Sequence, residues 1–349
     1  MNLLGRGGGR AKWLQLVALV AILFISLTHR LSLLDQRGGD FPVYRGSAEE
    51  LLRRENPYQH TVESFQTPGT KHWYAYLPLW LYSNTSSYLF SSRVPFLDFE
   101  QAMKIPVLIG DLGLALLLYA ILVRVSPFAA FVGVAGWLFN PHILVTNNYT
   151  HFDPLPSLFV LLSLYALNRS GVVASLSLAA AVGFKQYAIL LVPYYLISME
   201  AKRAFILSFG GALLLISLPF LLWDSASFVY STVIAHLTRG FGGRSVLGMV
   251  NELLGLSIPS TVGLLLIGAL YAWLLLGKRA IGKYAFATLA IGIVLVFSPV
   301  LHRTYGLWLL PVYFAWAGIF ASTTERKNLV FALLVGGLYC LYWGYLAVY

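Results

Sequence analysis

The strongest constraint on the fold is a series of eight long apolar runs spread along the chain. They lie at 13–28, 105–123, 128–147, 204–223, 256–277, 284–301, 304–321 and 328–349. Several reach the ~20 residues that a helix needs to cross the hydrocarbon core of a bilayer. Helices satisfy their own backbone hydrogen bonds in lipid, and the alternating pattern of a transmembrane β-barrel is absent. The runs therefore predict an all-α polytopic membrane protein.

Composition and charge also indicate a membrane protein. The chain is 58% hydrophobic and 11% charged, whereas soluble domains carry roughly a quarter charged residues. A net charge of +10 would suit nucleic acid, but the basic residues are dispersed between the apolar runs. Membrane topology explains this dispersal better, so we expect no nucleic-acid partner. The single cysteine, Cys340, excludes an intramolecular disulfide.

Basic residues between the runs predict which loops face the cytoplasm. The first run follows Arg6, Arg10 and Lys12, and it is too long for a secretory signal peptide and lacks its cleavage pattern. With this N-terminus inside, the short cytoplasmic loops collect Arg124, Arg169, Lys202, Arg203, Lys278, Arg279, Lys283, Arg326 and Lys327. We expect a multi-pass protein of the cell membrane, or of the endoplasmic reticulum membrane in a eukaryote, with its C-terminus outside.

The segment 170–199 does not fit a single crossing. It starts and ends at cytoplasmic charges, yet it is mostly apolar and has Lys185 in its middle. We expect two short helices that enter from the cytoplasm and meet near Lys185, because broken helices at membrane depth need protein or a wet cavity around them. The predicted fold is one membrane domain, residues 1–349, with about nine to eleven transmembrane helices.

Two large loops are predicted on the outer face, at about 35–103 and 224–257. In the first, 46–56 is expected to form a short amphipathic helix, and the aromatic stretch 74–92 a short helix pair or an interfacial segment. The second contains the Gly-rich sequence TRGFGGRS, which predicts a flexible segment. These loops place the working surface of the protein on the non-cytoplasmic side.

Ionisable residues in or beside apolar runs are costly, which makes them the first candidates for function. Asp40, in RGGDFPVY, lies just past the first run, where a carboxylate can act as a general base toward a hydroxyl or remain a solvated loop residue. Asp153 closes a polar cluster with Asn147, Asn148 and His151. This cluster suits a sugar or acceptor hydroxyls, although Asp153 before a proline is an equally natural helix cap.

Four further ionisable groups each have a functional and a structural interpretation. Lys185, in GFKQY, needs an anionic partner at membrane depth, either a lipid phosphate or a carboxylate of the protein. Asp111 either pairs with a neighbouring helix or takes part in chemistry. His302 and Arg303 suit proton transfer and phosphate binding, or form a basic turn that faces headgroups. The spacing of histidines and acids does not predict a metal site.

Six stretches resemble one known group of membrane enzymes. They are GGDFPVYRGSAEELLRRENPYQ, YAYLPLWLY, IPVLIGDLGLALLLY, FNPHILVTNNYTHFDPLPSLFVLLSLYAL, GFKQYAILLVPYYL and SPVLHRTYGLWLLP, in this order between residues 38 and 311. Their order and spacing resemble the GT-C class of membrane glycosyltransferases. Within it the chain looks closest to the polyprenyl-phosphate-mannose-dependent mannosyltransferases, of the family 87 type, which are similar to the eukaryotic GPI mannosyltransferase I.

The resemblance implies a GT-C-like bundle with a long first outer loop and an active site at the outer face. It implies inverting transfer of a hexose, mannose by the family pattern, from a polyprenyl- or dolichyl-phosphate to a hydroxyl of a glycan, glycolipid or protein. The first-loop acid of the family falls on Asp40, the expected base, and His302 is the competing base. The Gly-Gln-x-Asp-like segment of the family falls on Thr150–Asp153, where His151 replaces the glutamine and leaves the donor sugar open.

The same resemblance assigns binding residues. The expected ligands of the donor phosphate are Arg303 and Lys185. The other expected substrate-binding residues, for the sugar or for holding the first loop, are Asp153, His151, Tyr44 and Asn148. The first loop lacks an Asp-x-Asp pair, so neither a metal nor another cofactor is expected, and the lipid-linked sugar is itself the donor substrate.

Two other classes of protein stay open at this point. A transporter or flippase of a lipid-linked or small polar substrate would also contain a re-entrant segment with a buried lysine. Transporter halves usually repeat, however, and this sequence has no visible repeat. A non-catalytic subunit of a membrane complex is the third interpretation, and it would tolerate replacement of the outer acidic and basic residues.

Overall fold

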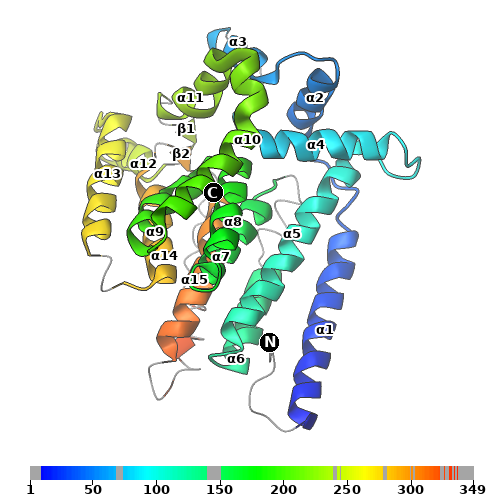
Figure 1. Cartoon of the computed structure of the whole chain (residues 1–349), viewed down its shortest axis with the longest axis vertical. Helices are drawn as coiled ribbons and strands as arrows, with labels where there is room; N and C mark the ends of the chain where they lie inside the picture. The colour runs from blue at the N-terminus through cyan, green and yellow to red at the C-terminus, as the bar shows by residue number, and fades with distance from the viewer. Residues whose placement is uncertain are drawn as a thin grey trace.

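The computed structural model describes residues 9–67, 74–139, 151–238, 242–243, 245–277, 281–298, 300–301 and 303–322, with residues 326, 330, 331, 334 and 336. Within these parts of the chain, helices form nearly all of the regular structure (Figure 1). The only sheet in them pairs β1 (Gly242–Gly243) in parallel with β2 (Val300–Leu301). This short pairing ties the second outer segment to the chain that precedes α15.

Three helical segments are long and apolar enough to cross a bilayer, namely Ala11–Leu31, Phe99–Leu122 and Lys202–Leu237. They belong to α1 (Gly9–Leu31), α5 (Phe99–Leu122) and α10 (Lys202–Val229), the last of which continues through a π-helical turn into α11 (Ala235–Leu237). Shorter apolar helices pack beside them: α6 (Pro127–Leu138), α7 (Pro154–Ala166), α8 (Gly171–Phe184), α9 (Val192–Ser198), α13 (Ser260–Leu276), α14 (Lys283–Phe297) and α15 (Gly306–Ala321).

Large apolar side chains cover the outside of this bundle. Leu215 on α10 and Leu265 on α13, for example, are each 72% exposed. Such exposure is costly in water and favourable in lipid. The chain is therefore a helical polytopic membrane protein, as its apolar runs predict.

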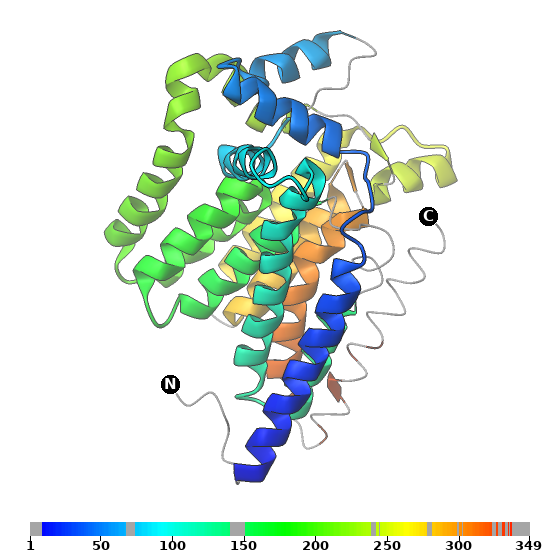
Figure 2. The same cartoon turned by 90° about the vertical axis from the view of Figure 1, so that its right-hand side faces the viewer.

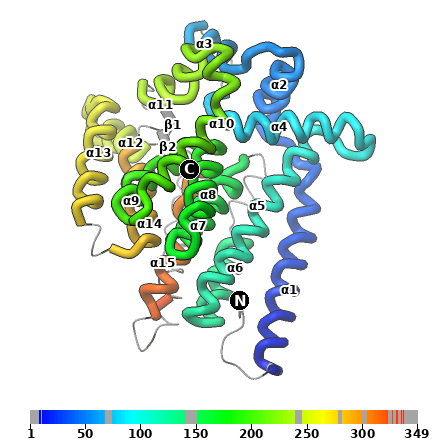
Figure 3. Tube along the Cα trace, viewed as in Figure 1, coloured from blue at the N-terminus to red at the C-terminus, as the bar shows by residue number. Residues whose placement is uncertain are grey.

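The predicted first outer loop folds into three short helices at one end of the bundle. These are α2 (Phe41–Leu52), α3 (Pro57–Gln66) and α4 (Pro78–Ser91), and α4 lies across the direction of α1 and α5 (Figures 1 and 3). The predicted helix at 46–56 had the wrong bounds: α2 starts earlier because Pro42 fits a first helical turn, and the chain turns at Arg54, whose φ is 62°. Residues 74–92 contain the single helix α4 and no helix pair. Of the two predicted arrangements, an interfacial segment therefore agrees better with the structure.

The segment 170–199 breaks at Lys185, as predicted. Lys185 has extended backbone angles (φ −153°, ψ 125°) between α8 and a 3₁₀ turn that leads into α9. The two arms fold back on each other, so that their far ends meet. A Cβ built on Gly171, at the start of α8, would lie 2.8 Å from Cε of Met199, just after α9. Lys185 is therefore at the tip of a folded-back pair of helices, with α8 packed between α7 and α10.

The predicted second outer loop contains more helix than the sequence predicted. α10 continues past its kink at Asp224, and α12 (Val246–Leu254) follows further along the chain. The Asp224 carboxylate accepts a hydrogen bond from the backbone N–H of Ser227 at 3.0 Å, which restarts the helix after the kink. Half of TRGFGGRS, residues 239–241 and 244, lies outside the described residues.

The middle of the bundle is formed by α7, which contacts α5, α8 and α15. Seen from the side, α10 lies on the opposite flank of the bundle from α1 (Figure 2). The start of α7 is thus enclosed by several helices, and the residue at this start is Asp153.

Candidate active site

Asp40 lies at the junction between the first span and the outer helices. It occupies the N-cap position of α2, but its side chain makes no capping hydrogen bond. Instead, its Oδ2 atom is 3.2 Å from Nδ1 of His151, and its side chain remains 46% exposed. The carboxylate is therefore held in place while it keeps access to a substrate.

Asp153 also occupies an N-cap position, that of α7, without capping the helix. Its Oδ1 atom accepts a hydrogen bond from Nζ of Lys185 at 2.7 Å, and the two side chains are 0% and 8% exposed. The indole N–H of Trp308 donates to the same oxygen. Of the two interpretations that the sequence left open, capping is therefore not what this carboxylate does.

Aromatic rings enclose the ammonium group of Lys185. Its Nζ atom lies 5.0 Å from the ring centre of Trp308, 5.1 Å from Phe152, 5.2 Å from Tyr305 and 5.5 Å from Tyr76. Cation–π attraction adds to the ion pair in such a dry setting. Lys185 thus lies at the same end of the bundle as Asp153, because α8 carries it there.

The surroundings of Asp40 set its acidity. Burial raises the pKa of Asp40, while the charge of Lys185 and the Tyr44 hydroxyl lower it and the charge of Asp153 raises it. The ring of Tyr44 is 1% exposed and packs edge-on against Trp80 at 5.5 Å. A carboxyl group with a raised pKa is a better proton acceptor near neutral pH.

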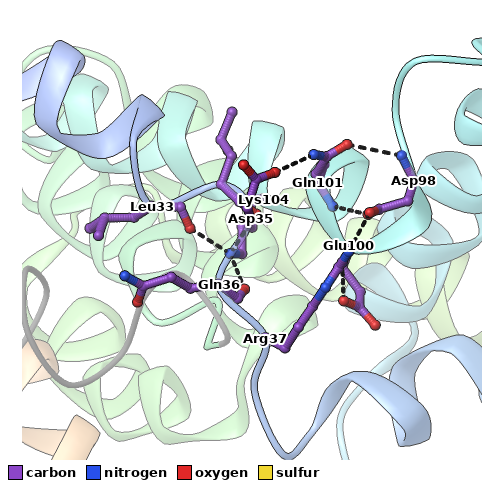
Figure 4. A network of polar contacts seen from close by, with 9 residues as sticks. Leu33, Asp35, Gln36, Arg37, Asp98, Glu100, Gln101 and Lys104 are labelled. Carbon is purple, nitrogen blue, oxygen red and sulfur yellow. Dashed lines mark hydrogen bonds and ion pairs between the residues drawn. The ribbon is translucent and has the colours of Figure 1, made fainter.

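A polar network fixes the chain just before Asp40 to the start of α5 (Figure 4). Nζ of Lys104 donates to the backbone carbonyls of Leu33, Leu34 and Gln36 at 2.8, 2.9 and 2.6 Å. Beside it, Arg37 donates to Asp98 at 2.6 Å and forms an ion pair with Glu100, and the Gln101 amide donates to Asp35 at 2.6 Å. The Lys104 residue is buried, whereas the Arg37 side chain is 54% exposed.

Asp111 forms a structural pair. Its Oδ2 atom accepts from Nε of Arg30 at 2.5 Å, and both side chains are 0% exposed. This pair joins the last turn of α1 to the middle of α5. The pairing alternative for Asp111 is therefore the one that its contacts support.

The structure brings five of the predicted site residues together. Asp40, Tyr44, His151, Asp153 and Lys185 share one end of the bundle, where His151 is also within electrostatic range of Asp153. The other three lie outside the described part of the chain, either entirely or by their side chains: Asn148, His302 and Arg303.

Sequence reasoning missed the aromatic enclosure of Lys185. Trp308 stands in the same motif as the predicted residues His302 and Arg303, SPVLHRTYGLWLLP, and its indole N–H was not predicted as a donor. Tyr187 stacks on Trp308 with ring centres 4.2 Å apart. The signal available in the sequence was the concentration of aromatic residues beside each ionisable candidate.

The fold and these residues define a multi-pass helical membrane protein with a polar site at one end of its bundle. The sequence profile of glycosyltransferase family 87 matches residues 80–299. The chain therefore belongs to glycosyltransferase family 87 and is a membrane glycosyltransferase. No curated protein and no solved structure matches it significantly.

Family membership favours the transferase over the transporter and the non-catalytic subunit. The matched part contains Asp153 and Lys185, while Asp40 precedes it and His302 and Arg303 follow it. The likeness of the first loop to the mannosyltransferases thus stays a prediction from the motif around Asp40.

Proposed function

We propose that this glycosyltransferase moves a hexose, with mannose as the first expectation, from a polyprenyl- or dolichyl-phosphate to a hydroxyl of a glycan or glycolipid. The observation that carries the proposal is the carboxylate of Asp40, which is half-buried, has a raised pKa and does not cap its helix. It stands where the first outer helix meets the bundle, so a lipid-borne substrate can reach it from the bilayer. The architecture that we infer is GT-C-like, with about nine to eleven crossings.

In the proposed reaction Asp40 is the general base. It takes the proton of the acceptor hydroxyl while the oxygen of that hydroxyl attacks C1 of the sugar. The bond between C1 and the phosphate oxygen breaks, and the phosphate leaves with the electron pair. Attack opposite the leaving group inverts the configuration at C1, and one well-placed carboxylate suffices for such a displacement.

His151 and Tyr44 support the base in this proposal. The imidazole of His151 holds Oδ2 of Asp40, which leaves Oδ1 for the acceptor proton. Tyr44 is too deeply buried to stack on a sugar, so of its two expected roles only the support of the loop agrees with its burial. His302 stays the competing base, and Asn148 a proposed contact to the sugar or acceptor.

The leaving phosphate needs cationic donors in the transition state. Arg303 and Lys185 are the proposed donors, and Lys185 already neutralises Asp153. An ammonium has three N–H donors, so Lys185 is able to keep this pair and also contact a phosphate. We give Lys185 the additional role of holding Asp153, which makes Arg303 the stronger proposed phosphate ligand.

The test is transfer of radiolabelled mannose from polyprenyl-phosphate-mannose by the purified protein. Asp40→Asn should lower the transfer rate about 100- to 10,000-fold, as expected for loss of a general base. The matched control is Glu55→Gln, which changes an exposed acid of the same loop that pairs with Arg53 and should leave the rate within about twofold. Full transfer by Asp40→Asn would refute the base assignment and make His302→Ala the next variant to measure.

A further inference from the structure

A second polar site lies at the end of the bundle opposite Asp40. It is an open pocket of about 420 Å³ lined by Ile121, Arg124, Val125, Tyr165, Asn168, Arg169, Lys283, Tyr284 and Ile319. α7 has 13 residues, so at 1.5 Å per residue its two ends are about 20 Å apart. Asp153 is at one end of α7 and this pocket at the other, which separates the two sites.

Three cations from three different elements meet in this pocket. Arg124 follows α5, Arg169 follows α7, and Lys283 is the first residue of α14. No carboxylate lines the pocket among the residues that the structure describes, and Arg169 repels Lys283 across it. Converging like charges without a counter-ion raise the free energy of the empty pocket, and a bound anion would lower it.

Tyr165 holds both arginines in position. Its hydroxyl accepts from Nη2 of Arg124 at 3.2 Å, and its backbone carbonyl accepts from Nη1 of Arg169 at 2.5 Å. The guanidinium of Arg169 also lies 3.9 Å from the centre of the Tyr165 ring. Each guanidinium has five N–H donors, so these bonds leave most of its donors for a ligand.

Two more features favour an oxyanion in this pocket. It opens at the N-terminus of α14, where Gly282 provides no side-chain cap and the first backbone N–H groups have no helical acceptor. The rest of the wall is apolar and comes from Ile121, Val125 and Ile319. A ligand with an anionic group and an apolar portion would contact both the cations and the apolar wall of the pocket.

We propose that this pocket binds a phosphate group, presented by an anionic lipid headgroup or by a soluble phosphate. Guanidinium groups match phosphate oxygens in bidentate geometry, and basic pockets between membrane helices accept anionic headgroups. The apolar wall favours the lipid as the source. This proposal concerns anion binding only, and it does not depend on the transfer reaction proposed above.

A competing explanation is that these cations only set the topology of the chain. Setting the topology requires only an excess of positive charge on one side of the membrane. It requires neither a pocket nor guanidinium groups held in fixed positions. Arg203, an exposed residue at the start of α10, provides the matched comparison, because it contributes to the same charge bias without lining the pocket.

The experiment measures binding of dioctanoyl phosphatidylglycerol, dioctanoyl phosphatidylcholine and inorganic phosphate to the purified full-length protein in neutral detergent, by native mass spectrometry and thermal shift. The wild type should bind phosphatidylglycerol at least about tenfold more tightly than phosphatidylcholine, because charge-assisted hydrogen bonds discriminate by this much or more. Arg169→Gln and Lys283→Gln should each remove about tenfold of this affinity, and Arg203→Gln should keep it.

The outcomes separate the two sources and the proposal from its rival. Variant-sensitive binding of phosphatidylglycerol that phosphate does not displace identifies a lipid headgroup, and variant-sensitive binding of inorganic phosphate identifies a soluble ligand. A wild type that binds neither anion in preference to phosphatidylcholine would overturn the proposal, and this arm needs no variant to fold. Equal loss in Arg203→Gln and in the pocket variants would overturn it as well.

Discussion

At the scale of single residues, two carboxylates do different work because their surroundings differ. Asp40 is partly exposed and its burial raises its pKa, which suits a group that gains and loses a proton. Asp153 is fully buried against Lys185 and Trp308, which suits a permanent charge. Pairs of carboxylates in contrasting environments commonly divide the tasks of a site in this way.

Replacing Tyr44 by phenylalanine should change the pH dependence of transfer. The Tyr44 hydroxyl lowers the pKa of Asp40, so its removal raises that pKa further. Because the proposed base acts only when deprotonated, the acidic limb of kcat/KM should move to higher pH in Tyr44→Phe, and the plateau should change little. The measurement is a pH profile of mannosyl transfer.

Tyr119→Phe is the matched control for Tyr44→Phe. Like Tyr44, Tyr119 has a buried hydroxyl, but it lies on α5 beside Phe131, far from Asp40. Its pH profile should match that of the wild type. An unchanged acidic limb in Tyr44→Phe would mean that Asp40 is not the titrating base.

The Asp153–Lys185 pair should show strong coupling in a double-mutant cycle. Asp153→Leu or Lys185→Met alone leaves a buried charge without its partner, which should lower the free energy of unfolding by about 3–5 kcal/mol. The double variant contains neither charge, so it should lose less than the sum of the two. Thermal unfolding in detergent measures this, and additive losses would contradict the buried pair.

At the scale of secondary-structure elements, the position of Asp40 depends on how the start of α2 is fastened. Two sets of contacts hold this segment. The buried Lys104 donates to three backbone carbonyls, and the exposed Arg37 pairs with two carboxylates. Exposed ion pairs contribute about 0–1 kcal/mol, whereas hydrogen bonds from a buried charge contribute about 1.5–3 kcal/mol. The buried part should dominate.

Lys104→Met should therefore affect transfer much more than Arg37→Ala. Without the ammonium, the carbonyls at 33–36 lose their donor and Asp40 shifts, and a misplacement of about 1 Å can lower a rate ~100-fold. Arg37→Ala should keep the rate within about threefold. Transfer rates and the protease sensitivity of residues 32–40 measure both effects, and equal losses in the two variants would contradict the assignment.

The packing of α13 on α14 offers a second test at this scale. A Cβ on Gly263 would lie 2.4 Å from the backbone oxygen of Phe297, which cannot move aside easily, whereas a Cβ on Gly268 would meet nothing within 4 Å. Gly263→Ala should lower the melting temperature. Gly268→Ala, on the same helix, should leave it unchanged or raise it, since alanine favours helix by about 1 kcal/mol. Equal melting temperatures would contradict this contact.

The sequence predicted elements best where one local signal dominated. Apolar runs located α1, α5 and α10, and the lysine inside 170–199 located the break between α8 and α9. The bounds of α2 and the helical continuation of α10 were missed, because they depend on the turn at Arg54 and on the cap that Asp224 provides after a kink. Such features follow from backbone geometry more than from composition.

The site could be predicted only in part for a related reason. The motifs supplied Asp40, Asp153 and Lys185, since ionisable residues beside apolar runs stand out. Their pairing depends on helices that bring residue 185 next to residue 153 and residue 151 next to residue 40. One sequence does not reveal such contacts between helices, so the ion pair of Lys185 was left open between a lipid phosphate and a carboxylate.

At the scale of the whole molecule, the two polar sites lie at opposite ends of one bundle. Exposed positions near each end are Phe96, between α4 and α5, and Glu200, between α9 and α10. In a Cys340→Ser background, Phe96→Cys should react with an impermeant maleimide on intact cells, and Glu200→Cys should react only after the membrane is opened. Labelling of both from one side would contradict the proposed topology.

The folded-back helices α8 and α9 have a consequence for how the chain is made. Asp153 precedes Lys185 by 32 positions, so the ribosome delivers the acid to the membrane before the base. A lone lysine entering lipid costs several kcal/mol, but here its counter-charge is already in place at the start of α7. If α7 leaves the translocon before α8, the incoming ammonium meets its counter-charge on entry, and we expect no stage at which the bilayer holds an unmatched cation.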